Sequence, residues 1–307
     1  MNEIIGIEIT PPAVSDKIKS LIEAFLSGRN SLTIKAYRQD LESFSKFLKS
    51  HSAKDSVHSL LSLLPGDANA LTLSYRSRMI EERLSPATIN RRLASLRALV
   101  KLARTLGLIT WKIEIQNIKS QSYRDLRGPE ISKLKNVILE LVQRNSPKTK
   151  RDLAIIRLLH DLGLRRGEVT SLDLAHIDLN LGTISILGKG KTERTNLTLP
   201  EETQWALRNW IEIRGNEPGA LFINFDRAKK GKRLTGSGLY ALSKYYGLGR
   251  PHGIRHLAIT EALDKTGGDV RSVQRFSRHK NLAILNIYDD NRQDLGGSVA
   301  KIVAAGL

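Results

Sequence analysis

Residues 252–256 read His-Gly-Ile-Arg-His, and His279 and Tyr288 follow them, nine residues apart. Together they supply a cationic, hydrogen-bonding group of side chains with one hydroxyl nucleophile beside it. Arginine and histidine bind phosphate oxygens, and a phenol can attack phosphorus. The combination therefore suits chemistry on a phosphodiester, and it decides how the rest of the chain is interpreted.

Two upstream motifs supply the other groups that such chemistry requires. Residues 163–168 read Gly-Leu-Arg-Arg-Gly-Glu and contain Arg165, and residues 188–191 read Gly-Lys-Gly-Lys and contain Lys189. Two arginines from different segments can stabilise the excess negative charge of the transition state without a metal. The attacking phenol, with a reference pKa of about 10, must lose a proton, and the departing oxygen must gain one.

With these elements in this order, the chain resembles the tyrosine recombinase (phage integrase) family over nearly its whole length. The resemblance implies that Arg165 and Arg255 are the two arginines that clamp the scissile phosphate. It also implies that Glu168 is a buried structural partner of the first arginine.

The resemblance assigns the remaining roles as well. Lys189, at the tip of an expected hairpin, would protonate the leaving 5′-oxygen, and His252 would be the general acid/base. His279 would hydrogen-bond to the phosphate, and Tyr288 would form a 3′-phosphotyrosyl link. Since this link conserves the energy of the phosphodiester, we expect no cofactor.

Two positions depart from the family pattern. The residue before His279 is usually glycine in the family, and here it is Arg278. Its cation either adds to phosphate binding or points away, and the sequence leaves both possibilities open. Residues 289–291, directly after Tyr288, are acidic or amide side chains, and nearby carboxylates disfavour a phenolate.

The charge of the chain indicates a polyanionic partner. Its 307 residues fit two domains, and the formal net charge is +18. Residues 1–120 contain 18 basic and 11 acidic side chains, and residues 121–307 contain 31 and 20. An excess on both halves favours two basic domains that clamp one DNA duplex.

Other protein classes are disfavoured by what the sequence lacks. There is no cysteine, which removes disulfides, thiolate zinc sites and cysteine nucleophiles. We see neither an apolar run of about 20 residues for a membrane span nor a signal peptide. Although His252 and His256 on one helix could bind a metal, we expect no metal, and we expect a cytoplasmic, nucleoid-associated protein.

Helical periodicity dominates the N-terminal half. Residues 31–48 and 85–106 predict amphipathic helices, the second with Ser85 as N-cap, and two more helices are expected near 13–27 and 67–83. We therefore predict a helical, SAM-like core-binding domain over residues 1–118. Its candidate DNA contacts lie on the two amphipathic helices and are Lys35, Arg38, Arg91 and Arg92.

A polar, basic segment at 119–128 is interpreted as a linker, and residues 129–307 as a mixed α/β, mostly helical catalytic domain. Alternation at 182–187 and 194–199 predicts a β-hairpin with Lys189 at its tip. The fold class is therefore mainly α with a small β-hairpin or sheet. Further helices are expected near 129–144, 148–162, 166–174, 201–213, 235–246, 253–265, 269–277 and 281–288.

The sequence favours a site-specific recombinase that acts on short inverted-repeat core sites in double-stranded DNA. The segment before the first helices is short, so we expect no arm-binding domain. The resemblance implies a dimer on one site and a homotetramer on two, with an accessory or partner recombinase left open. Residues 295–307 could pack on a neighbouring protomer or on their own domain. The alternative functions are a type IB topoisomerase-like nicking-closing enzyme and a catalytically silent DNA-binding module.

Overall fold

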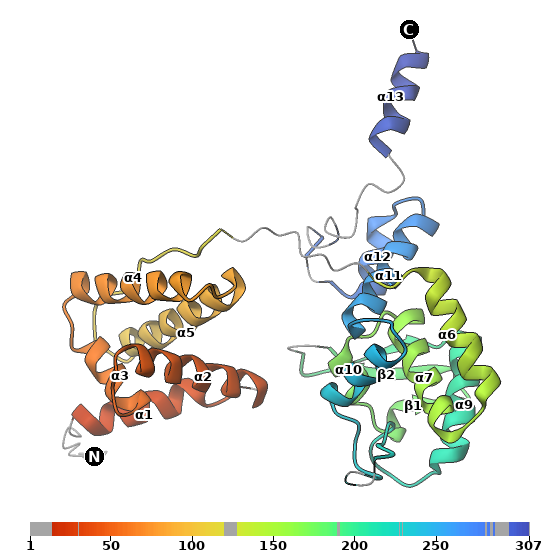
Figure 1. The fold of residues 1–307 in the computed structure, drawn as a ribbon, viewed down its shortest axis with the longest axis horizontal. Helices are drawn as coiled ribbons and strands as arrows, with labels where there is room; N and C mark the ends of the chain where they lie inside the picture. The colour runs from red at the N-terminus through yellow and green to blue at the C-terminus, as the bar shows by residue number, and fades with distance from the viewer. Residues whose placement is uncertain are drawn as a thin grey trace, which may run out of the picture. The chain divides into compact units, whose positions relative to one another are not determined.

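The computed structural model describes residues 14–29, 31–119, 128–188, 191–226, 228, 230–279, 281–282, 285 and 295–306. The chain divides into two compact units, Met1–Gln121 and Ser122–Leu307 (Figure 1). Both are built mainly from helices, and the second also holds a small sheet, so the expected fold class is confirmed. Among the described residues, no helix combines the length and hydrophobicity that a membrane span requires.

The first unit consists of helices α1 to α5. Its helices are α1 (Val14–Leu26), α2 (Ser31–Phe47), α3 (Ala53–Leu61), α4 (Pro65–Glu81) and α5 (Pro86–Thr105). The four helices expected from the sequence are confirmed. Helix α3 was not predicted, although Ser52 caps it by accepting a hydrogen bond from the backbone N–H of Asp55 at 3.1 Å.

Helix α5 contributes most to the core of this unit. Ser85 accepts a hydrogen bond from the N–H of Thr88 at 3.3 Å, and Pro86 occupies the first turn, so the helix begins where expected. Its apolar face is buried against α1, α2 and α4. The buried residues of that face are Ile89, Leu93, Leu96, Leu99, Val100 and Ala103.

The second unit begins with α6 (Ile131–Arg144), α7 (Pro147–Asp161) and the short α8 (Arg166–Thr170). After a 3₁₀ turn (Leu174–His176) come β1 (Ile177–Asp178), β2 (Thr183–Leu187) and β3 (Arg194–Thr198). The remaining helices are α9 (Glu201–Arg214), α10 (Gly236–Tyr245), α11 (Pro251–Lys265), α12 (Val270–Ser277) and α13 (Leu295–Ala305). The helix expected near 281–288 lies largely outside the described residues.

The predicted hairpin is confirmed as an antiparallel pair of strands. Strands β2 and β3 pair from Thr183 opposite Thr198 to Leu187 opposite Arg194. Ile184 and Ile186 alternate onto the buried face, as a two-residue period requires. The short strand β1, which was not predicted, pairs with the outer edge of β2.

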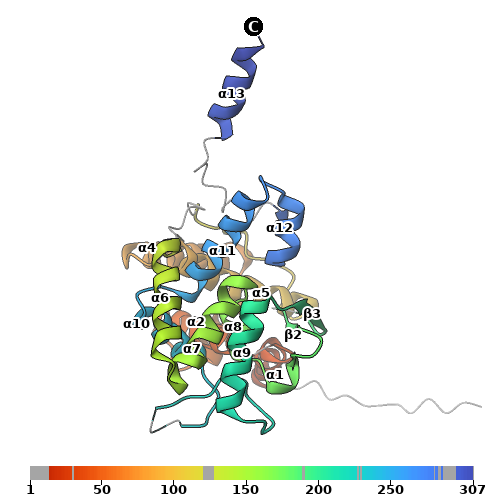
Figure 2. The same cartoon turned by 90° about the vertical axis from the view of Figure 1, so that its right-hand side faces the viewer.

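Helix α7 is the central element of the second unit. It packs against α6, α9 and α11 (Figures 1 and 2), and its residues 153–156, 158 and 159 are buried. This packing fixes the end of α7 at Asp161, directly before the turn that carries Arg165. It also fixes α11, whose first turns carry His252 and Arg255. The core therefore positions two of the candidate motifs against each other.

The last described helix, α13, exposes its apolar side chains. Val299, Ile302 and Val303 are 58%, 72% and 65% exposed. These three side chains recur at helical spacing on α13.

Candidate active site

The turn between α7 and α8 holds Arg165 in a fixed conformation. Gly163 has a φ of +53°, and a Cβ there would lie 3.3 Å from the ring of Phe276, so the turn favours glycine. Glu168, buried at 4% exposure, accepts from the backbone N–H of Arg165 and from its Nη1, both at 2.8 Å. The Arg165 side chain stays 30% exposed and can meet a ligand.

Arg255 joins three segments of the second unit. Its side chain is 1% exposed and donates to the carbonyl oxygens of Gly163 and Ser277. Its Nη2 also lies 3.3 Å from Nε2 of His279. The guanidinium thus links the Arg165 turn, the end of α12 and the candidate phosphate-binding histidine.

The positive charges of Arg165 and Arg255 act on both candidate histidines. Burial, the cations Arg255 and Arg165 and the neighbouring His252 together lower the pKa of His279 to about 4. Desolvation, Arg255 and Arg165 lower the pKa of His252 as well. Both imidazoles are therefore neutral at pH 7, and a neutral imidazole can accept a proton.

Arg278, which stands where the family usually has glycine, points into the protein. Its side chain is 13% exposed. Its Nη1 donates to the carbonyl oxygens of Leu162 at 3.1 Å and Phe276 at 2.8 Å, and its Nη2 donates to that of Gly163 at 2.9 Å. The sequence left the direction of this cation open, and the structure shows it turned toward the α7–α8 turn.

Four of the six candidate catalytic residues are brought together by these contacts: Arg165, His252, Arg255 and His279. Lys189 and Tyr288 lie outside the described residues. Within the described ranges, no group of three or more His, Asp or Glu side chains is arranged to hold a metal. The cluster is thus a positively charged site with two exposed or half-exposed neutral imidazoles.

Two family models match the chain. The model of the phage integrase family matches residues 126–294, which is more than half of the chain and contains the whole cluster. The model of the phage integrase N-terminal SAM-like domain matches residues 18–106. The chain belongs to the phage integrase family. The recognised family and the SAM-like architecture of the first unit are thereby confirmed.

Curated relatives from this family align with most of the chain. The chain is 36% identical over 309 residues to tyrosine recombinase slr0733 of Synechocystis sp., covering 96% of this chain and 98% of the relative. It is 29% identical over 287 residues to tyrosine recombinase XerC of Corynebacterium glutamicum, covering 89% and 87%. The expected enzyme class, a tyrosine-type recombinase, is confirmed.

Solved structures share the recombinase fold. The Tn1549 transposon integrase in complex with transposon right end DNA matches with a TM-score of 0.65 and 18% identity, covering 94% of this chain and 99% of that chain. The XerH site-specific recombinase bound to palindromic difH substrate matches with a TM-score of 0.63 and 21% identity, covering 94% and 86%. At these identities the likeness shows the fold.

The four DNA-contact candidates of the recombinase occupy two kinds of environment. Lys35 and Arg38 are exposed on α2. Arg91 on α5 is 42% exposed, and its Nη1 lies 2.6 Å from Oδ1 of Asp40, a side chain that is 1% exposed. Arg92 is half-buried and lies close enough to Asp40 to lower its pKa, although burial raises that pKa overall.

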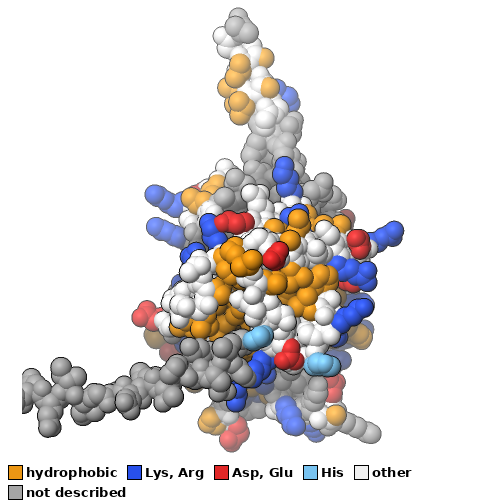
Figure 3. Space-filling view, turned by 90° about the vertical axis from the view of Figure 1, so that its left-hand side faces the viewer, with side chains coloured by type: hydrophobic (Ala, Val, Ile, Leu, Met, Phe, Trp, Pro, Cys, Tyr) orange, Lys and Arg blue, Asp and Glu red, His pale blue; other side chains and the backbone are white. Residues whose placement is uncertain are grey.

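A concave region of about 590 Å³ in the first unit adds basic residues that the sequence did not single out. It lies where α2, α4 and α5 meet, and Tyr75, whose hydroxyl bonds to Ser43 at 2.9 Å, lines it. Its charged lining residues are Lys46, Lys49, Arg78, Glu82 and Arg92. Figure 3 shows a view onto the first unit, in which apolar side chains lie next to Lys, Arg, Asp and Glu side chains.

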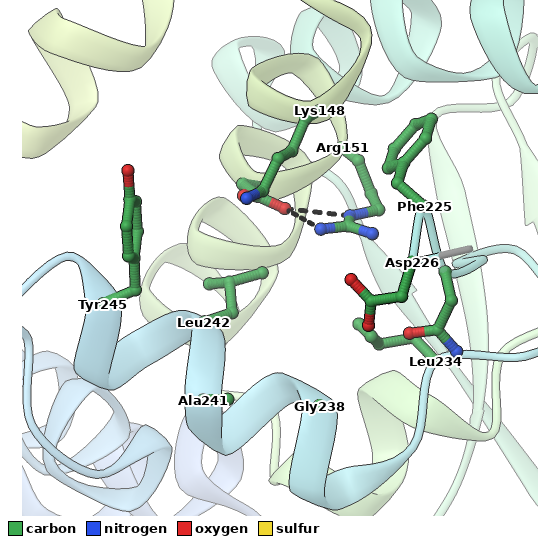
Figure 4. Close-up of a pocket in the computed structure, with 11 residues that line it drawn as sticks. Lys148, Arg151, Phe225, Asp226, Leu234, Gly238, Ala241, Leu242 and Tyr245 are labelled. Atoms are coloured by element: carbon green, nitrogen blue, oxygen red, sulfur yellow. Dashed lines mark hydrogen bonds and ion pairs between the residues drawn. The ribbon is translucent and has the colours of Figure 1, made fainter. Parts of the chain in front are cut away.

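A second pocket of about 480 Å³ lies in the catalytic unit, away from the arginine cluster. Lys148 and Arg151 from the start of α7, Phe225 and Asp226 from a loop, and Tyr245 from α10 line it (Figure 4). Arg151 is held by Asp152 at 2.7 Å and lies over the Phe225 ring. Lys148 and Arg151 stand in the first turns of α7, whereas Arg165 follows its last turn, and none of the four clustered residues lines the pocket.

Proposed function

We propose that the protein is a site-specific DNA recombinase that cleaves and rejoins strands through a covalent 3′-phosphotyrosyl intermediate. One observation carries the proposal: hydrogen bonds hold Arg165 and Arg255 in one cluster with His279, and His252 lies near enough for the charges of both arginines to lower its pKa. Two preorganised guanidinium groups can bind the non-bridging oxygens of a phosphodiester and stabilise the charge that develops there.

The proposed reaction is a transesterification with balanced protons. The phenol oxygen of Tyr288 attacks phosphorus while the bond from phosphorus to the 5′-oxygen breaks. His252, neutral at pH 7 because its pKa is lowered, can take the phenol proton. Lys189 gives a proton to the departing 5′-oxygen, which leaves as a 5′-hydroxyl. Religation runs the same steps in reverse on a new 5′-hydroxyl, so neither cofactor nor metal is required.

The partner in this proposal is double-stranded DNA. A net charge of +18, shared between both halves of the chain, supports a clamp with one basic unit on each face of the duplex. The contacts from the core-binding domain would come from Lys35, Arg38, Arg91 and Arg92. The solved relatives described above are bound to DNA, which supports the same assignment.

The biological unit follows from the same proposal. We propose residues 1–118 as the core-binding domain, 119–128 as the linker and 129–307 as the catalytic domain. Two protomers would bind one inverted-repeat core site, and four would join two sites, with or without an accessory or partner recombinase. The outcome would be integration or excision of a mobile element, or dimer resolution, in the cytoplasm and on the nucleoid.

The proposal is tested by covalent trapping. Nicked suicide duplexes cut from the DNA that flanks the gene are incubated in chelator with wild-type protein and with Tyr288→Phe. A protease-sensitive, slowly migrating DNA species with wild-type protein alone supports the proposal. Binding without any adduct would favour a silent DNA-binding module, and relaxation of a plasmid without joining of two sites would favour a topoisomerase-like enzyme.

A further inference from the structure

Arg278 is built into the protein more firmly than a surface arginine. Besides its three bonds to main-chain carbonyls, its Nη2 lies 3.3 Å from Oε2 of Glu168. These partners come from the end of α7, the α7–α8 turn, α8 and the end of α12. One side chain thus fastens the end of α12 to the turn that carries Arg165.

Two of the four partners of Arg278 are also partners of the two clamp arginines. Glu168 accepts from Arg165 through both oxygens and from Arg278 through one of them. The carbonyl oxygen of Gly163 accepts from Arg255 and from Arg278. In addition, Nη2 of Arg165 lies 3.4 Å from the carbonyl oxygen of Arg278. Arg278 thus shares one acceptor with each clamp arginine: Glu168 with Arg165, and the Gly163 carbonyl with Arg255.

The backbone of Arg278 supports this interpretation. Its φ of +56° and ψ of 37° place it in the left-handed region at the end of α12, a conformation that glycine adopts more readily than arginine. That turn is what sends the side chain back under α12 toward Gly163 and Glu168. Glycine would make the same turn without strain. It would remove one donor from each of the three carbonyls and from the carboxylate, and the Gly163 carbonyl would keep only Arg255 and Glu168 only Arg165 as a side-chain donor among these arginines.

We propose that Arg278 is a positioning residue for strand cleavage, which acts through Glu168 and the Gly163 carbonyl to hold the guanidinium groups of Arg165 and Arg255 toward the scissile phosphate. This inference rests on the proposed function. Most N–H donors of Arg278 are hydrogen-bonded to protein acceptors, and its side chain is nearly buried. It therefore contributes to cleavage by fixing the positions of the clamp arginines rather than by binding DNA. A lysine cannot replace it, because an ammonium lacks the planar fork that reaches four acceptors.

The first test compares single-turnover cleavage by wild-type protein, Arg278→Gly and Arg278→Lys at saturating suicide DNA. Glycine preserves the left-handed turn, and Arg275→Ala, an exposed cation on α12, controls for the loss of one charge. We expect both Arg278 variants to cleave about 10- to 100-fold more slowly, with DNA affinity changed less than about threefold, because misplaced catalytic groups lower the rate more than binding. Wild-type rates in both variants would overturn the proposal.

The second test needs neither DNA nor catalysis. Side-chain NMR relaxation of the arginine Nε–H groups reports how rigidly Arg165 and Arg255 are held. It is measured without DNA, in the wild-type protein and in Arg278→Gly. We expect both groups to become more mobile in the variant, whereas a purely structural role would lower the melting temperature and leave their order unchanged. Unchanged order would overturn the positioning role. A wild-type protein that forms no adduct would overturn the proposed function instead, and this second test would still decide the role of Arg278.

Discussion

His160 and Glu261 join helices α7 and α11 directly: Nε2 of the imidazole lies 2.8 Å from Oε2 of the carboxylate. The other ring nitrogen of His160 lies 2.8 Å from Oδ1 of Asp161, and Thr203 on α9 donates to Oδ2 of Asp161 at 2.7 Å. The histidine is thus enclosed by two carboxylates at the end of α7, three residues before Gly163. The same contact secures the helix that carries Arg255.

The His160 contact predicts a pH-dependent contribution to stability. Burial lowers the pKa of His160, but hydrogen bonds to Asp161 and Glu261 and their charges outweigh it, so the pKa is raised above 6.5. A raised pKa means that the stabilisation is complete below about pH 6.5 and is lost as the pH rises through the folded-state pKa. The difference in melting temperature between wild type and His160→Gln should therefore shrink as the pH is raised from 5.5 to 8.5, to be followed by calorimetry.

The substitution itself should destabilise the second unit. His160→Gln removes the charged partner that Asp161 and Glu261 share and leaves them only the longer ion pairs with Arg157 and Lys265, which costs about 1–3 kcal/mol at pH 6. His58→Gln, at an exposed position on α3, is the matched control and should change the free energy of unfolding by less than about 0.5 kcal/mol. Equal effects of the two substitutions would contradict the role assigned to His160.

The protonation of the active-site histidines should change when DNA binds. With a pKa near 4, His279 is neutral in the free protein, and a phosphate placed between the arginines would raise that pKa. Binding of suicide-competent DNA to Tyr288→Phe at about pH 6 should therefore take up protons, seen as a buffer-dependent heat in calorimetry. If His279→Gln removed none of this uptake, His279 would not face the phosphate.

Two cations of the first unit should have different effects on stability when they are removed. Arg91→Ala leaves the buried carboxylate of Asp40 without its ion pair, so we expect a loss of about 1–3 kcal/mol in the free energy of unfolding. Lys35→Ala, at an exposed position, should cost less than about 0.5 kcal/mol. If Lys35 contacts a phosphate, its loss should lower the salt slope of DNA binding by about one, measured by fluorescence anisotropy.

Gly163 should tolerate no side chain. Gly163→Ala adds the strain of a left-handed alanine, about 1–2 kcal/mol, and a methyl group 3.3 Å from the Phe276 ring, beside the carbonyl that holds Arg255. Cleavage should fall at least tenfold. Gly107→Ala carries the same strain at φ +70° with no atom within 4 Å, so it should lose stability only. A similar loss of cleavage in both variants would contradict a specific role of Gly163 in the active site.

Much of the fold could be predicted because its signals are local. Ser85 and Pro86 mark the start of α5, and the alternating isoleucines of β2 predict a half-buried strand. Helix α3, with nine residues, and β1, with two, are too short for periodicity to separate them from loops. Their existence depends on packing and pairing with distant segments.

The site was predicted as a set of residues rather than as a geometry. The resemblance indicated Arg165, His252, Arg255 and His279, and the structure brings them together. The resemblance could not indicate which way Arg278 points, because that depends on a left-handed turn at the end of α12. Nor could it indicate the contact of His160 with Glu261, since these residues are 101 positions apart and neither belongs to a motif.

The most direct measurement of the central claim is mass spectrometry of the protein–DNA adduct after digestion with protease and nuclease. The proposed function predicts a single peptide spanning Tyr288 that carries a nucleotide on its phenol oxygen through a 3′-phosphate, and a free 5′-hydroxyl on the released strand. A nucleotide on another residue, or an adduct that persists in Tyr288→Phe, would contradict it.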